Sequence, residues 1–229
     1  MSNSEAKSMH AAGERAKYFV RFHRLRYEYE EHELPKRSYV KVLVDPEGRH
    51  LRRLWLRADG TLTTREELQY SPEGALIRIA NFDAKDARKG HTVINDLGGG
   101  RKSLHRFDAS GKPVEVIEEK RNERGFLLWE LHQKVTEHGE RLELVQRIEY
   151  EYPLSGVRHA YFFDANGEPQ FEMIDKYNEH GDLLETEKLD SSGKVVSRSV
   201  YKFDSRRRVK CRTDYDETGN VTAEEDYQE

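Results

Sequence analysis

The sequence predicts an all-β protein: an antiparallel meander of repeated hairpins, a curved or spiralling repeat sheet, that starts with a short N-terminal helix. Three observations support this prediction. Glycines recur at intervals of roughly a dozen residues. Residues that favour tight turns precede most of these glycines. The segments between turns alternate apolar and polar residues and are rich in Val, Ile, Leu and aromatics, as half-buried strands are.

The N-terminal residues 1–36 differ from the rest of the chain. Tyr18, Phe22, Leu25 and Tyr29 are spaced 4, 3 and 4 residues apart, which places them on one face of a helix. We expect a helix up to about Phe22 and leave residues 24–33 open between helix and first strand. The chain then divides into a helical cap or lead-in over 1–36 and a hairpin array over 37–229.

The turns of the array share one sequence pattern, here called the turn text. An apolar or aromatic residue stands four positions before the glycine, and Asp, Asn or Ser directly follows that apolar residue. Such a side chain can bond the backbone two residues on, and glycine supplies the left-handed residue that closes a type I hairpin turn. Arg207 fills one glycine slot. The texts read VDPEG, YSPEG, FDASG, FDANG, YNEHG, LDSSG, FDSRR and YDETG.

These turn texts resemble the YD repeats of RHS proteins, above all at Phe163 to Gly167 and Tyr215 to Gly219. The resemblance spans most of residues 40 to 227. In RHS and teneurin-type proteins such repeats form a β-sheet shell that encloses a cargo or presents a surface. For this chain the resemblance implies the architecture, and a bacterial, toxin-associated setting.

The rhythm breaks between Ala80 and Arg101, where an aromatic-Asp pair lacks its glycine and a Gly98-Gly99-Gly100 run follows. Backbone N–H groups of that run could surround a phosphate. A P-loop, however, requires different spacing and a following helix. We therefore expect a longer hairpin loop here.

Near the C-terminus, Arg208, Lys210 and Arg212 fall on one face of a strand. Pairing about the turn before Gly219 places Lys210 near Glu225, and Arg212 near Ala223 or Glu224. We expect this basic row to be neutralised by the acidic strand that follows it.

Composition argues against several function classes. The chain has 39 Lys and Arg against 43 Asp and Glu, for a net charge of −4, so bulk charge indicates neither nucleic acid nor a membrane. With one cysteine, Cys211, and no His-x-x-x-His pattern, we expect no metal site and no cofactor. The sequence contains no motif that places a nucleophilic Ser or Cys beside a general base, such as G-x-S-x-G. We expect a cytoplasmic protein that is not an enzyme.

The function that follows is a β-repeat scaffold or protein-interaction module. Its partner is expected to be another protein, with no small-molecule substrate. Two alternatives stay open: an antitoxin or immunity-type protein that occludes an enzyme through the acidic run from Asp214, and a binder of nucleic acid or an anionic surface through the basic N-terminal helix. The candidate partner-binding residues are Trp55, Trp129, Tyr161, Phe162, Arg21, Arg24 and Arg26.

Overall fold

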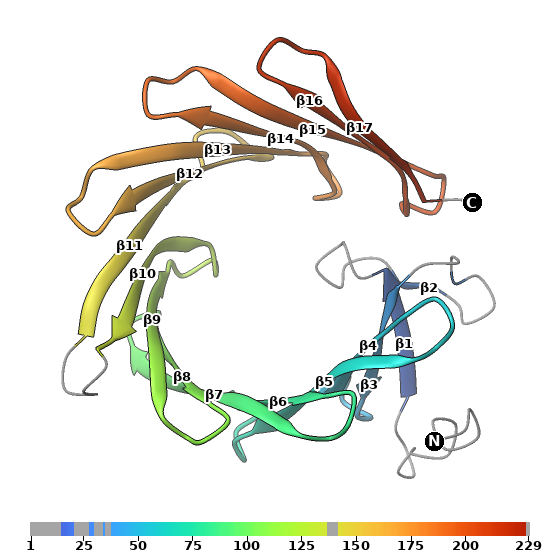
Figure 1. Cartoon of the computed structure of the whole chain (residues 1–229), viewed down its shortest axis with the longest axis vertical. Coiled ribbons are helices and arrows are strands. Elements are labelled where there is room, and N and C mark those ends of the chain that lie inside the picture. The colour runs from blue at the N-terminus through green and yellow to red at the C-terminus, as the bar shows by residue number, and fades with distance from the viewer. Residues whose placement is uncertain (1–14, 21–27, 30–33, 35–37, 137–141, 228–229) are drawn as a thin grey trace. The chain divides into compact units, whose positions relative to one another are not determined.

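The computed structural model describes residues 15–20, 28–29, 34, 38–136 and 142–227 (Figure 1). These residues contain no helix and form seventeen strands. The strands are β1 (Arg15–Val20), β2 (Glu28–Tyr29), β3 (Tyr39–Val44), β4 (His50–Leu56), β5 (Leu62–Tyr70), β6 (Leu76–Asp83), β7 (Arg88–Gly98), β8 (Arg101–Asp108), β9 (Pro113–Arg121), β10 (Leu127–Val135), β11 (Leu142–Glu151), β12 (Val157–Asp164), β13 (Pro169–Tyr177), β14 (Leu183–Asp190), β15 (Val195–Phe203), β16 (Val209–Asp216) and β17 (Val221–Asp226).

The chain divides into two compact units. The first contains the residues up to Ile94 together with Arg106–Lys112, and the second contains Asn95–His105 together with the residues from Pro113 onward. In the first unit, each strand from β3 to β6 pairs antiparallel with the next strand along the chain. In the second, β9 to β17 do the same. The expected antiparallel hairpin array is therefore confirmed.

The helix expected up to Phe22 is wrong for Arg15–Val20, which form β1. This strand pairs antiparallel with β3, placing Phe19 opposite Val40. Phe19 is buried in the cluster that Val40, Val42 and Val44 form with Trp55 at its margin. Sheet pairing and this apolar contact outweigh the helical spacing of the aromatics. The rest of the expected helix lies outside the described residues.

The pairing of β1 with β3 crosses the boundary between the regions 1–36 and 37–229 that the sequence suggests. β1 and β2 pair with each other, and β1 also pairs with β3. Hydrogen bonds thus join residues on either side of position 36, and Glu28–Tyr29, within the segment left open at 24–33, form a strand.

The turns have the geometry that their text predicts, as the turn after β12 illustrates. Gly167 N donates to Asp164 O at 3.1 Å, and Asp164 N donates to Glu168 O at 3.0 Å. Gly167 has a φ of 85°, which an L side chain rarely adopts. The Asp164 carboxylate accepts from Asn166 N at 2.8 Å and Glu168 N at 3.0 Å. A register shift before the turn completes the bulged hairpin.

The longer loop expected between Ala80 and Arg101 is wrong. Asp86 takes the glycine slot with a φ of 65°, a conformation that Asp tolerates better than most residues, and closes an ordinary tight turn after Asp83. β7 then runs without interruption to Gly98. Gly99 and Gly100, with φ values of 59° and 76°, form a two-residue turn of the mirror-image type.

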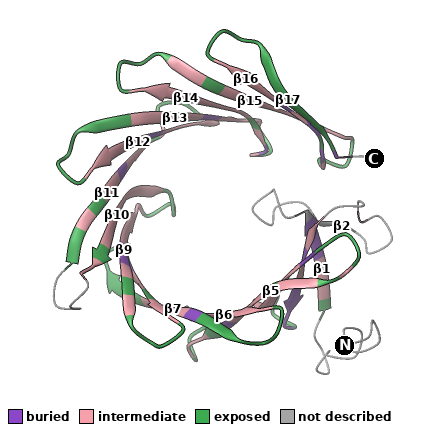
Figure 2. Ribbon diagram, viewed as in Figure 1, coloured by how far each residue is buried: buried purple, intermediate pink, exposed green. Residues whose placement is uncertain are grey.

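Few side chains are fully buried in either unit, and most strand residues are intermediate in exposure (Figure 2). Within the second unit, cross-strand polar contacts occupy one face. Tyr150 Oη donates to Glu130 Oε2 at 2.7 Å. Arg158 forms an ion pair with Asp175, whose other carboxylate oxygen accepts from Thr186 Oγ1 at 2.7 Å. These contacts connect β10 to β11 and β12 to β13 and β14, and they stabilise a sheet with little apolar core.

The register expected for the last hairpin is wrong by one to two residues. Arg212 pairs with Glu225, and Tyr227 N donates to Lys210 O at 2.8 Å. A bulge between Asp214 and Tyr215 shifts the pairing. Arg212 contacts an acid on its own strand, Asp214, with Nε 2.8 Å from Oδ1.

Candidate functional site

The candidate site lies on turns at one end of the second unit. In a meander, alternate turns lie at the same end of the sheet, so the turns after β7, β9 and β11 share one end. Gly100 O accepts a hydrogen bond from Arg121 N at 2.8 Å, which joins the first two of these turns. Tyr152 Oη donates to Leu127 O at 3.1 Å, which joins the second and third.

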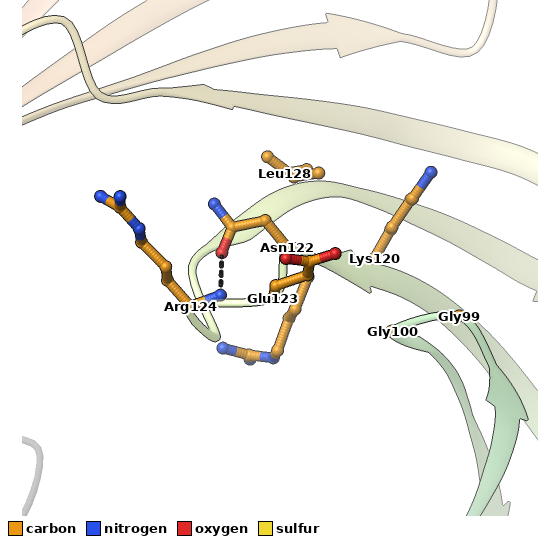
Figure 3. A pocket seen from close by; sticks show the side chains of 8 residues that line it. Gly99, Gly100, Lys120, Asn122, Glu123, Arg124 and Leu128 are labelled. Carbon is orange, nitrogen blue, oxygen red and sulfur yellow. Dashed lines mark hydrogen bonds between the residues drawn. The ribbon is translucent and has the colours of Figure 1, made fainter.

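An open pocket of about 660 Å³ lies beside the first two turns (Figure 3). In this view the side chains of Lys120 and Arg124 lie on either side of Asn122 and Glu123, with Leu128 beside them. The pocket is lined by Gly99, Gly100, Lys120, Arg121, Asn122, Glu123, Arg124 and Leu128.

The turn after β9 is held by its own first residue. Asn122 Oδ1 accepts from Arg124 N and from Phe126 N, both at 3.0 Å. Arg121 Nε contacts Glu119 Oε1 at 3.0 Å, and this hydrogen bond raises the pKa of the Arg121 guanidinium above its ordinary value. Arg121 Nη1 also donates to Gly125 O at 3.1 Å. Two side chains thus fix the turn that forms the pocket wall.

Two exposed apolar side chains lie on the turns after β9 and β11. Phe126 is 46% exposed and its ring lies 4.9 Å from that of Tyr152. Leu154, in the turn two residues after Tyr152, is 70% exposed. Burial raises the pKa of the Tyr152 phenol, so this side chain remains a neutral hydrogen-bond donor. We call Lys120, Arg124, Phe126, Leu128, Tyr152 and Leu154 the turn-end surface.

Chemically, this surface combines cations, amide and backbone donors, and apolar side chains, which suits binding better than bond making. Among the residues that the structure describes, no group of three His, Cys, Asp or Glu side chains could hold a metal ion. Cys211 is buried on β16, with Sγ 3.6 Å from Glu224 Oε1. No described helix is long and apolar enough to cross a membrane.

The aromatic residues singled out from the sequence do not form one site. Trp55 lies on β4 in the first unit and packs against the Phe19 cluster. Trp129 lies on β10, and Tyr161 and Phe162 lie on β12, all in the second unit with intermediate exposure. Adjacent residues of a strand point to opposite faces, so Tyr161 and Phe162 lie on different faces. The Phe162 ring stacks on Phe171, 4.1 Å between centroids.

Arg21, Arg24 and Arg26 lie outside the described residues. Whether any of the seven candidate residues binds a partner stays a prediction.

Sequence reasoning missed Phe126 and Leu154. A signal was available for each, because Phe126 directly follows the glycine of its turn, where most repeats have a polar residue. Leu154 stands two residues before Gly156, at a position that holds Pro, Ala, Ser or Glu in the other texts. A large apolar residue at a position that is otherwise small or polar in a repeat indicates an exposed apolar side chain.

Comparison with known proteins gives no family. No family model matches the sequence, and no curated protein matches it. A porin-like protein from Bacteroides uniformis matches with a TM-score of 0.47 and 9% identity, over 93% of this chain and 92% of that chain. The Tc holotoxin pore of Photorhabdus luminescens matches with a TM-score of 0.18 and 11% identity, over 82% of this chain but 15% of that chain.

Both TM-scores are below 0.5, so neither similarity carries an argument about function. The description of the protein therefore rests on its own geometry: an all-β antiparallel meander of repeated hairpins.

Proposed function

We propose that the protein is a non-enzymatic scaffold of β-hairpin repeats that binds another protein through the turn-end surface. The observation that carries this proposal is the pair of exposed apolar side chains at adjoining turns, Phe126 and Leu154. Apolar groups clustered at the surface and surrounded by polar residues are typical of protein-binding sites. Here Tyr152 joins the two turns, because its ring contacts Phe126 and its hydroxyl donates to the neighbouring strand.

The sheet faces of the second unit support the same choice of surface. Ion pairs cover one face of β13 to β15, where Lys176 Nζ lies 2.6 Å from Glu185 Oε1 and Arg198 Nε lies 3.8 Å from Glu185 Oε2. Side chains engaged across strands are less available to a partner than the apolar groups at the turns.

We infer that the repeat is of the YD type found in RHS proteins and that the protein works in a bacterial, toxin-associated setting in the cytoplasm. The aromatic-Asp turn text and its recurring bulged hairpin support this inference. Its partner would then be a protein of the same setting, without a cofactor or a small-molecule substrate.

The test is affinity capture of the tagged protein from a lysate of its source organism, with nuclease, read by mass spectrometry. We expect a stoichiometric protein partner that is lost from the double variant Phe126→Ser with Leu154→Ser. The matched control is Val145→Ser, which makes the same kind of change at a side chain that is 51% exposed on β11. Equal loss from both variants would contradict the proposed surface.

A second candidate function is favoured by β17. Every residue of this strand is exposed, including the acidic Glu224, Glu225 and Asp226. An exposed acidic strand suits an immunity-type protein that occludes a basic site on an enzyme. Under that function, Glu224→Gln with Asp226→Asn would lose the captured partner while the Phe126 and Leu154 variant retains it. Capture that disappears with nuclease would instead favour the nucleic-acid alternative.

A further inference from the structure

Most arginines within the strands are neutralised by an acid of the sheet. In the first unit, Arg53 Nη1 lies 3.2 Å from Glu66 Oε2. Ion pairs of the same kind are made by Arg65, Arg101, Arg121, Arg147, Arg158, Arg198 and Arg212. Arg78 on β6 and Arg88 on β7 depart from this pattern, because neither makes an ion pair with a described residue.

The strand register explains why these two arginines have no cross-strand acid. Gln69 on β5 and Val93 on β7 lie opposite Arg78. Phe82 on β6 lies opposite Arg88. Three positions where an acid would form a cross-strand ion pair are therefore occupied by uncharged side chains.

His91 lies between the two arginines on the same face of the sheet. It pairs with Ala80 on β6. Arg78 precedes Ala80 by two residues, and Arg88 pairs with the residue two positions after it. Two strand residues span about 7 Å, which places the imidazole within reach of both arginine side chains. Burial first, and then the charges of Arg78 and Arg88, lower the pKa of His91 below its ordinary value of 6.5. The imidazole is therefore neutral at pH 7 and presents a ring N–H.

Two acids at the turn between β6 and β7 are engaged by other groups. Asp83 Oδ2 lies 3.1 Å from Lys89 Nζ, and its Oδ1 accepts from the backbone of the turn. Asp86 pairs with Arg65 on β5. Neither acid pairs with the two arginines, which retain their positive charges beside a neutral imidazole.

Parts of Arg78 and His91 are withdrawn from water without a replacement hydrogen bond. Arg78 Nε and His91 Nδ1 are buried and have no hydrogen-bond partner. The His91 ring also stacks on Phe107, with 4.5 Å between centroids. A charge in such surroundings is screened less than on a fully solvated arginine, so it attracts an anion more strongly.

We propose that Arg78, His91 and Arg88 bind a phosphate dianion, either inorganic phosphate or the phosphate group of a monoester. The two guanidinium groups balance its two negative charges and match phosphate oxygens in hydrogen-bond geometry. A carboxylate or a phosphodiester has one negative charge and would leave one arginine uncompensated. The proposal goes beyond the proposed function, because this site lies in the first unit and the turn-end surface lies in the second.

The test is a histidine NMR titration of the whole protein with inorganic phosphate, at about pH 8, where phosphate is a dianion. Ionic strength is held constant, so that screening does not change. The variant His91→Gln assigns the His91 resonances. We expect these resonances to shift with saturation, and we expect acetate to need at least about tenfold higher concentration for half-saturation.

Removal of both arginines has two expected effects. Arg78→Gln with Arg88→Gln should weaken phosphate binding at least about tenfold. The same variant should raise the pKa of His91 in the free protein, because two positive charges near the imidazole are gone. The matched control Arg124→Gln with Lys194→Gln removes two cations at exposed turn positions of the second unit and should change neither quantity. Thermal unfolding verifies that each variant is folded.

Three results would overturn the proposal: no saturable shift of the His91 resonances, equal binding of acetate, or equal loss of binding in the control variant. A single-stranded oligonucleotide without terminal phosphates that competes equally would overturn the dianion in favour of a phosphodiester backbone.

A phosphoserine peptide distinguishes the two sources of the phosphate group. Displacement of inorganic phosphate by this peptide, and not by its unphosphorylated form, would support the proposal with a modified protein as the source. Saturable phosphate binding that the peptide does not displace would support it with free phosphate as the ligand.

Discussion

At the scale of single residues, Arg207 shows how the repeat tolerates a missing glycine. It has a φ of 63°, which costs a non-glycine residue about 1 kcal/mol. Its guanidinium bonds the preceding turn at this end, with Nε 3.0 Å from Asp182 Oδ2 and Nη2 2.8 Å from Oδ1. Asp182 is 1% exposed, so this contact neutralises a buried carboxylate.

We therefore predict that Arg207→Ala lowers the free energy of unfolding by about 2 kcal/mol, because a buried carboxylate loses its cation. Arg207→Gly should lower the free energy of unfolding by about 1 kcal/mol less than Arg207→Ala does, since glycine adopts the left-handed conformation without strain. Urea denaturation measures both. If Arg207→Ala with Asp182→Asn is no more stable than the two single effects added together, the pairing contributes nothing and the account of this turn is wrong.

Gly100 supports a second prediction at this scale. A Cβ added there would lie 2.3 Å from Arg121 O, and its φ is 76°. Gly99 has a φ of 59°, and a Cβ added there would have no neighbouring atom within 4 Å. We expect Gly100→Ala to destabilise the protein by about 3 kcal/mol, from backbone clash and conformation together, and Gly99→Ala by about 1 kcal/mol. Thermal unfolding of the pair tests this, and equal losses would show that conformation alone matters.

At the scale of elements, the turns were predictable and the first strand was not. An Asp followed three residues later by glycine determines its own hairpin, because the carboxylate and the left-handed residue are local. β1 depends on contacts with β3, so the spacing of Tyr18 and Phe22 alone could not reveal it. Asp86 was missed because Asp can replace glycine at a positive φ.

The site was less predictable than the fold. The turns that carry Phe126 and Leu154 are joined through Tyr152, whose ring contacts Phe126 and whose hydroxyl donates to Leu127 O, twenty-five residues earlier in sequence. Sequence reasoning ranked exposed aromatics by residue type and so chose Trp55 and Trp129, which the sheet half-buries. Large aromatics are the side chains that a sheet with a thin core uses for its own packing.

The β9–β10 pair makes stability depend on pH. His132 Nε2 lies 4.0 Å from Glu130 Oε2, and Nδ1 lies 3.5 Å from Glu115 Oε1. Interaction with Glu130 first, and with Glu115 as well, raises the pKa of His132 above its ordinary value of 6.5, against the opposing effect of burial. The protonated imidazole therefore stabilises the fold at pH values below 6.5, and this contribution is lost as pH rises through the raised pKa.

We predict that His132→Gln destabilises the protein more at pH 6 than at pH 9, measured by urea denaturation at both pH values. Glu115→Gln removes one of the two carboxylates. When it is made in an otherwise wild-type chain, the pH-dependent stabilisation by His132 should become smaller. A His132→Gln effect that is the same at both pH values would show that the imidazole contributes only packing.

At the scale of the whole molecule, the architecture explains how a chain with 35% hydrophobic and 36% charged residues remains folded. Each strand of the second unit gains stability from its immediate neighbours through backbone ladders and cross-strand polar contacts, not from a shared central core. Stability of this kind is local, so turns can vary in sequence at one end of the sheet while the strands remain paired. The turn-end surface is such a variation.

Because stability is local, we predict that the effect of a destabilising substitution is confined to neighbouring strands. Asp175 is 4% exposed, and it holds Arg158 on β12 and Thr186 on β14. Asp175→Ala leaves Arg158 without its partner and should cost about 3 kcal/mol. In hydrogen exchange read by mass spectrometry, we expect faster amide exchange over β12 to β14 and little change at β9 and β17. The reason is that the lost contacts destabilise only the strands that make them and their immediate neighbours. Glu217→Ala, at an exposed turn position, serves as the control and should leave exchange unchanged. Acceleration that is uniform from β9 to β17 would mean that the second unit unfolds as one cooperative body.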